Sequence, residues 1–212
     1  FQARRFRGTY ADLMASPTFG PAARFFLEEL YSDTDYTDRD QQFGRIAGTL
    51  QTVFPQPVVN TAVALAVLHA QTEELDQDMG RAWLAHEGAD AANDAALYTA
   101  AWRTVGQRHA RQQQLQRVLA MGTDLARLTR TPGLRMMLRM MRGPANAAGM
   151  GALQKFLEAG FDTFGQLARQ RGGVEQFLAT IEQRERAQMD LLFDADPVTC
   201  GTQLNHTLGQ AR

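Results

Sequence analysis

The sequence holds no run of four or more residues, bounded by turn signals, in which apolar and polar residues strictly alternate. A half-buried β-strand requires that alternation, because its successive side chains point to opposite faces. The aliphatic composition also disfavours strands, since the chain has 23 Leu but only 9 Val and 2 Ile. β-branched side chains lose rotamer freedom in a helix and favour strands. The sequence therefore predicts an all-α protein.

Proline, glycine and capping residues divide the helical pattern into a bundle of seven or eight helices. Asn93 or Asp94 is expected to cap the fifth helix, and Gly106 or Gly122 to bend it. The Gly- and Pro-rich segment 143–151 is expected to be a loop. The predicted helices cover residues 2–15, 21–31, 37–54, 57–86, 93–128, 134–142, 152–170 and 174–193.

A single domain accounts for a chain of 212 residues. We place the helical bundle domain at residues 1–193. Residues 194–212 show no sustained apolar period, so we expect a C-terminal tail that is ordered only where it packs on something. The longest purely apolar stretch, residues 62–68, is far shorter than the ~20 residues of a membrane span.

The use of cysteine bears on the compartment in which the protein works. Cys200 is the single cysteine, so no intrachain disulfide forms. The arginines of residues 1–8 are not followed by the apolar core of a secretory signal. We therefore expect a cytoplasmic protein. A secreted chain whose signal has been removed is the alternative.

The net charge of −1 conceals a strong asymmetry along the chain. Residues 23–94 carry 13 acidic and 4 basic residues, whereas residues 101–142 carry nine Arg and one Asp. Either these two segments pack together and neutralise each other, or the arginine-rich segment forms an anion-binding face. We expect neutralisation, because mixed charge usually marks solvated faces. The charge pattern gives no strong nucleic-acid signal.

Several short motifs resemble a known family. They are FFLEELY at 25–31, RDQQF at 39–43, FP at 54–55, LH at 68–69, MRGPA at 141–145 and LQKFLEAGF at 153–161. Together they resemble an uncharacterised family of helical proteins from proteobacteria, over most of the chain. The resemblance implies a helical fold and carries no known activity.

Five polar or aromatic residues on two predicted helices form a candidate pocket. His69 and Glu73 lie one turn apart on the fourth helix, and Tyr98, Trp102 and His109 lie on one side of the fifth. A pocket between these two helices would bind a small apolar or anionic ligand, with haem ligated by His69 as one form. The favoured alternative is that the aromatic residues are core and that His69 is mostly buried, bonded to a neighbouring polar group.

The known catalytic and metal-binding motifs are absent. Neither Glu-x-x-His, which di-iron bundles need, nor His-Glu-x-x-His occurs in the sequence. Gly-x-Ser-x-Gly and the Gly-rich phosphate-binding spacings are absent as well. We therefore predict no catalytic residue and no metal ligand, lean towards a protein that is not an enzyme, and leave any cofactor unknown.

Two functional hypotheses remain. The first is a non-enzymatic helical interaction protein that forms a homodimer. Its basis is that Phe25 and Phe26 point about 100° apart on one short helix, which a single core would struggle to bury. The second is a pocket protein built around the five candidate residues. We interpret the amphipathic segment LRMMLRMMR, residues 134–142, as a core helix with a solvated arginine face.

Overall fold

The computed structural model describes residues 1–29, 56–86 and 93–211, in which every regular element is a helix. The all-α prediction is confirmed for this part of the chain, while the helix predicted at 37–54 lies outside it. The helices outnumber the seven or eight expected. They are α1 (Gln2–Thr9), α2 (Ala11–Ala15), α3 (Gly20–Glu29), α5 (Gln56–His86), α6 (Asp94–Val105), α7 (Arg108–Thr129), α8 (Leu134–Met140), α9 (Arg142–Ala147), α10 (Gly151–Arg169), α11 (Gly173–Asp194) and α12 (Pro197–Gln210).

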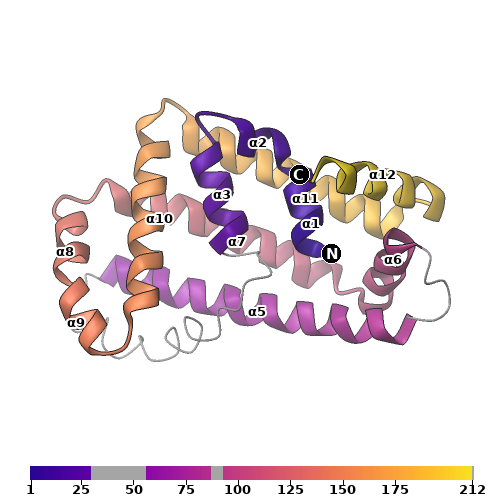
Figure 1. Cartoon of the computed structure of the whole chain (residues 1–212), viewed down its shortest axis with the longest axis horizontal. Coiled ribbons are helices and arrows are strands. Elements are labelled where there is room, and N and C mark those ends of the chain that lie inside the picture. Colours follow the sequence, from indigo (N-terminus) through magenta and orange to yellow (C-terminus); the bar gives the residue numbers. More distant parts are fainter. Residues whose placement is uncertain (30–55, 87–92, 212) are drawn as a thin grey trace.

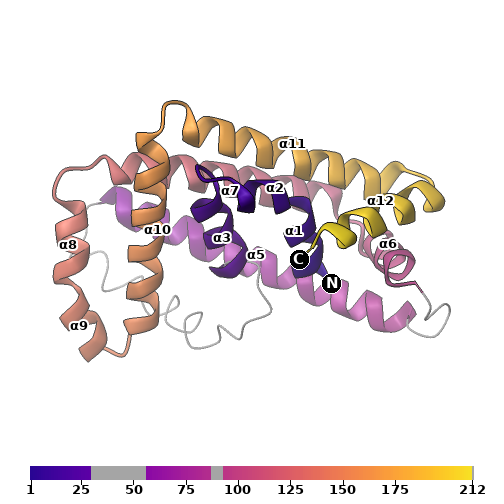
Figure 2. The same ribbon diagram turned by 45° about the horizontal axis from the view of Figure 1, so that its top comes forward.

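Three long helices set the shape of the molecule. Helix α7 packs against α5 on one side and α11 on the other, and all three run along the long axis (Figures 1 and 2). Helix α10 crosses one end of this layer, with α8 and α9 packed against it. Helices α6 and α12 pack together at the other end, and α1 to α3 lie over the middle. Among the described residues, no helix is both long and apolar enough to cross a membrane.

The apolar side chains form a large core and a smaller one. The large core joins α11 to its neighbours, and its most buried large side chains include Phe164, Phe177 and Leu192. The smaller core lies between α8, α10 and the start of α5, and it includes Leu138 and Phe156. It fixes the position of α8 and α9 at the end of the molecule.

The fifth predicted helix is capped as expected but is broken into α6 and α7. Asn93 caps α6, because its Oδ1 accepts hydrogen bonds from two backbone N–H groups of the first turn. Gly106 and Gln107 both have positive φ, +64° and +55°, which ends the helix instead of bending it. Gly122 introduces no break. It lies inside α7, where the side chain of Leu178 packs over it.

The expected loop at 143–151 is mostly helical. Helix α9 occupies Arg142–Ala147, and α10 begins at Gly151, so only residues 148–150 separate them. Pro144 lies in the first turn of α9, where a backbone N–H would have no intrahelical partner. The proline therefore does not prevent the helix, and the expectation of a loop is corrected.

The expected tail at 194–212 contains helix α12. Asp196 caps this helix by accepting hydrogen bonds from two backbone N–H groups, and Pro197 is its first residue. Cys200 and Leu204, one turn apart, are fully buried in the large core. The Cys200 Sγ lies 3.2 Å from the Thr99 Oγ1 of α6. Two residues of α12, Cys200 and Leu204, therefore belong to the large core.

Helices α1 and α12 come into very close contact. A Cβ added to Gly8 would lie 1.9 Å from the carbonyl oxygen of Thr207, which is a backbone atom. Only glycine fits at residue 8 while the two helices keep this separation. The first and last helices of the described chain are thus packed directly on each other.

Candidate anion-binding groove

The structure does not assemble the five residues of the sequence-predicted pocket into one site. Tyr98 and Trp102 are buried side by side, with ring centroids 5.9 Å apart. His109 lies exposed on α7, where its Nε2 is 2.9 Å from the Nε2 of Gln113. The break at Gly106 explains the separation, because residues on either side of it no longer share one helix face.

The other two candidate residues lie on α5. His69 is partly buried, so the prediction that it is mostly buried and bonded to a neighbouring polar group stays a prediction, and Glu73 is exposed. Over the described residues, no group of three or more His, Cys, Asp and Glu side chains could hold a metal ion. His69 and Glu73 therefore provide half of a ligand set at best.

Two buried arginines, Arg5 and Arg111, surround the Tyr98–Trp102 pair, and we call them the buried arginine pair. Arg5 and Arg111 are 2% and 5% exposed. The Arg111 guanidinium carbon lies 3.5 Å from the centroid of the Trp102 ring, a cation–π contact. An Arg5 nitrogen, Nη2, lies 3.5 Å from Glu185 Oε2. Arginine is seldom buried without full pairing, so this arrangement is unusual.

The electrostatics of the pair are uneven. Burial lowers the pKa of Arg111, and repulsion from Arg5 lowers it further. Burial also acts to lower the pKa of Arg5, but Glu185 and the neighbouring tyrosines raise it above its usual value. Burial raises the pKa of the Tyr98 phenol, whose hydroxyl donates a 3.3 Å hydrogen bond to Gln2. Among the described residues, Arg5 has one ion pair, with Glu185, whereas Arg111 has none.

Several donors of this cluster have no hydrogen-bond partner. Within the described part of the chain, the unpartnered buried nitrogens are Arg5 Nε and Nη1, Arg111 Nε and Nη2, Trp102 Nε1 and Gln188 Nε2. A buried donor without an acceptor costs about 1–3 kcal/mol, and more when it is charged. Nothing in the sequence marked Arg5 or Arg111 as buried.

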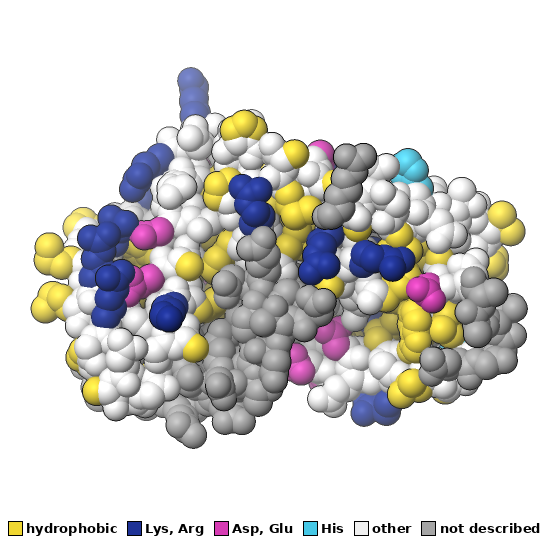
Figure 3. Space-filling view, viewed as in Figure 1, with side chains coloured by type: hydrophobic (Ala, Val, Ile, Leu, Met, Phe, Trp, Pro, Cys, Tyr) yellow, Lys and Arg dark blue, Asp and Glu magenta, His cyan; other side chains and the backbone are white. Residues whose placement is uncertain are grey.

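An open groove of about 460 Å³ lies at the other end of the molecule, between the end of α7, α8 and α10. Four arginines line it, and Asp162 is the only carboxylate among its lining residues. Figure 3 shows dark blue side chains gathered over α8 and α10 with magenta carboxylates between them. The four arginines are Arg130, Arg135, Arg139 and Arg169.

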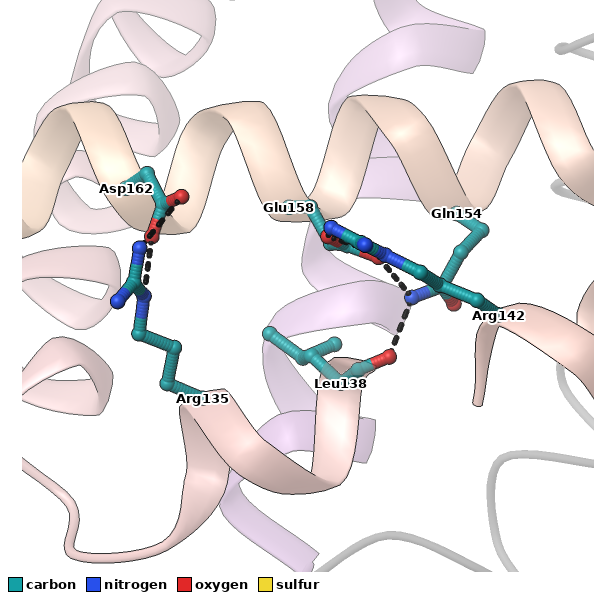
Figure 4. Close-up of polar contacts among 6 residues, drawn as sticks. All are labelled: Arg135, Leu138, Arg142, Gln154, Glu158 and Asp162. Carbon is teal, nitrogen blue, oxygen red and sulfur yellow. Dashed lines mark hydrogen bonds and ion pairs between the residues drawn. The ribbon is translucent and has the colours of Figure 1, made fainter. Parts of the chain in front are cut away.

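Hydrogen-bonded ion pairs hold α8 and α9 on α10 and so fix the groove walls (Figure 4). Arg135 donates from Nε and Nη2 to the two oxygens of Asp162, at 2.6 and 3.0 Å. Arg142 likewise donates hydrogen bonds to Glu158, and its Nε lies 2.7 and 2.9 Å from the two carboxylate oxygens. Buried Gln154 donates to the Leu138 carbonyl at 2.6 Å and to Glu158 at 2.8 Å.

Three of the four groove arginines make no ion pair in the described part of the chain. Arg130, Arg139 and Arg169 make no ion pair with any residue in the described ranges 1–29, 56–86 and 93–211. Arg135 is already paired with Asp162. The groove therefore carries three excess positive charges.

Exposed methionines lie beside these charges. Leu134 and Leu138 of α8 are buried, as the core-helix interpretation requires. Met136 and Met140, on the same helix, are 68% and 72% exposed. Met136 is also one of the groove's lining residues. The arginine face of α8 is therefore partly apolar and not simply solvated.

In the described part of the chain, the arginines of 101–142 make no ion pair with the acidic segment 23–94. Arg108 pairs with two acidic residues of α11, and Arg135 and Arg142 pair with α10. Arg127 pairs with Asp124 on its own helix. Helix α5 nevertheless packs against α7, and the charges of Asp76 and Asp78 act on Arg111. Many acidic residues of 23–94 lie outside the described residues, so both neutralisation and an anion-binding face stay predictions.

Comparison with known families places the chain. A family model described as "Domain of unknown function (DUF8198)" matches residues 1–199. The chain belongs to this family. The matched residues of this DUF8198 member include the whole groove and the buried arginine pair, and the resemblance to an uncharacterised family is confirmed. No curated protein and no solved structure matches the chain.

The wall of the groove should weaken in acid. The hydrogen bonds from Arg142, with a further contribution from Gln154, lower the pKa of Glu158. A carboxyl group whose pKa is lowered by folding stabilises the protein above its unfolded pKa, and this stabilisation is lost as pH falls through the folded pKa. We therefore expect Glu158→Gln to reduce the free energy of unfolding at pH 7, and the difference from the wild type to shrink below the ordinary pKa of 4.5. Urea titrations at pH 7 and pH 3 measure it, and an equal difference at both would contradict the assignment.

Proposed function

We propose that the chain is a non-enzymatic interaction protein whose groove binds an acidic, partly apolar segment of another protein. The observation that carries the proposal is a set of three arginines that have no ion-pair partner among the described residues, Arg130, Arg139 and Arg169, around a groove of about 460 Å³. Their charge is complementary to a run of carboxylates, which steers association and gives specificity.

The chemistry of the groove favours carboxylates. The planar guanidinium group presents paired N–H donors that match the two oxygens of a carboxylate. The neighbouring pair of Arg135 and Asp162 shows that α8 holds a carboxylate in this geometry, with contacts of 2.6 and 3.0 Å. Glutamate or aspartate side chains of a partner would use the same contacts on the unpaired arginines.

The exposed methionines favour a protein partner with apolar side chains. Met136 and Met140 offer flexible, polarisable surface that adapts to irregular partners. Arg and Met are enriched at protein interfaces whereas Lys is depleted, and Lys155 is the only lysine of this chain. A partner segment that alternates acidic and apolar residues would satisfy both the arginines and the methionines.

The groove is less suited to nucleic acid. Proteins that bind single strands stack bases on accessible aromatic rings. Phe161 is the only aromatic residue among the groove's lining residues, and it is 8% exposed.

A fluorescently labelled peptide rich in Glu and Leu tests the proposal by fluorescence anisotropy. We expect it to bind, with an affinity that falls as salt rises, and a peptide with Gln in place of Glu to bind much more weakly. Arg139→Glu should weaken binding at least about tenfold, because it adds repulsion to the lost attraction. Arg186→Glu is the matched control, since Arg186 is an exposed arginine on α11 that does not line the groove.

Three outcomes would overturn the proposal. Equal peptide binding by wild type and Arg139→Glu would remove the groove from the function. Binding of a single-stranded oligonucleotide in place of the peptide would assign the groove to nucleic acid. A mass of twice 23.5 kDa by light scattering, returned to 23.5 kDa by Arg139→Glu, would assign it to a second copy of the chain.

The last outcome bears on the homodimer that the sequence suggested. Phe25 and Phe26 are both buried within one chain, stacked on Phe156 and in edge contact with Phe164 respectively. Their helix therefore leaves no apolar phenylalanine face for a second copy. Self-association stays a proposal whose remaining basis is the groove.

A further inference from the structure

The unpartnered side-chain atoms inside the protein are all hydrogen-bond donors. The described chain has six such buried atoms, and five belong to Arg5, Arg111 and Trp102. Guanidinium and indole nitrogens cannot accept a hydrogen bond. These donors therefore need an acceptor, and the two positive charges of Arg5 and Arg111 favour an acceptor that is negatively charged.

These donors belong to one connected cluster. The Arg111 guanidinium lies on the Trp102 ring, and the charges of Arg5 and Arg111 are close enough to act on each other. The sixth atom, Nε2 of Gln188, is on α11 one turn after Glu185, which contacts Arg5. The cluster therefore joins α1, α6, α7 and α11.

The protein's own carboxylates do not fill the gap. Glu185 already accepts a 2.7 Å hydrogen bond from Tyr10 in addition to its contact with Arg5. Asp76, whose charge acts on Arg111, accepts a 2.8 Å hydrogen bond from Gln2. Neither carboxylate accepts a hydrogen bond from Arg111, whose Nε and Nη2 have no partner.

We propose that the buried arginine pair holds a small inorganic anion, between Arg5 and Arg111 and beside the Trp102 N–H. The near-complete burial of both arginines, 2% and 5% exposed, restricts the ligand to a halide or an inorganic oxyanion. The site is separate from the groove, since neither arginine lines it. An internal anion would tie the helices of the two halves of the chain together.

Thermal unfolding tests the site with two probes, bromide and inorganic phosphate, each exchanged at constant ionic strength for the bulky anion gluconate. A ligand of the folded state raises the melting temperature by about 3–5 °C for each tenfold increase above its dissociation constant. We expect this rise for at least one probe in the wild type and its loss in Arg111→Gln. Arg139→Gln, which removes a groove arginine, should keep it.

If Arg111→Gln does not fold, X-ray diffraction from wild-type crystals soaked in bromide tests the proposal instead. The anomalous signal should place a bromide within hydrogen-bond distance of Arg111 and Arg5. In crystals that contain phosphate, electron density for phosphate should take the place of the bromide. A melting temperature independent of both probes, with no density between the two arginines, would overturn the proposal. A rise that Arg139→Gln abolishes and Arg111→Gln keeps would also overturn it, because the anion would then lie in the groove.

Discussion

Leu204→Ala is expected to lower the free energy of unfolding by about 2–5 kcal/mol. Leu204 is fully buried in the large core, although it belongs to the segment with the weakest helical pattern in the sequence. The substitution removes buried methyl groups and leaves a cavity that α12 cannot easily close. Urea unfolding followed by circular dichroism measures the loss.

Val198→Ala is the matched control on the same helix. Val198 is 77% exposed, so its truncation should change the free energy of unfolding by no more than about 0.5 kcal/mol. Equal, small effects of the two substitutions would mean that residues 197–210 do not contribute to the core.

Gly8→Ala should lower the free energy of unfolding by about 1–3 kcal/mol, the usual cost of overpacking. The added methyl group would overlap the Thr207 carbonyl oxygen at 1.9 Å, and a backbone atom cannot move aside as a side chain can. Alanine is the better helix former, so the loss would occur against the local preference of α1. Thermal melts of the two proteins give the difference.

Gly201→Ala should change the free energy of unfolding in the opposite direction. A Cβ at Gly201 would meet no atom within 4 Å, and the residue lies inside α12. Relief of the glycine's backbone entropy should therefore stabilise the protein by up to about 1 kcal/mol. A Gly8→Ala protein as stable as Gly201→Ala would contradict the packing of α1 on α12.

The long helices could be predicted because each has a sustained apolar period. The predicted ranges 57–86, 152–170 and 174–193 differ from α5, α10 and α11 by at most one residue at either end. The short elements could not be predicted in the same way. Helix α12 buries only Cys200 and Leu204, too few residues to establish a period.

The candidate site depends on tertiary contacts that no local pattern contains. The sequence indicated that Tyr98 and Trp102 belong together and that segment 134–142 has an arginine face, and both features are present. The groove, however, also needs Arg130 from the end of α7 and Arg169 from α10, which meet α8 only through packing. Buried arginines such as Arg111 resemble solvated ones in a sequence, because their spacing carries no sign of what covers them.

The close contact at Gly8 has a consequence for biosynthesis. Helix α1 leaves the ribosome long before the backbone of Thr207, which covers Gly8, is made. Contacts between such distant residues form slowly, since the intervening chain must be ordered first. The large core therefore stays incomplete during translation. Until α12 has been made, the apolar side chains of α1 pack on a core that lacks this helix. A ribosome that stalls before residue 197 would leave a nascent chain with open apolar surface, a substrate for chaperones and proteases.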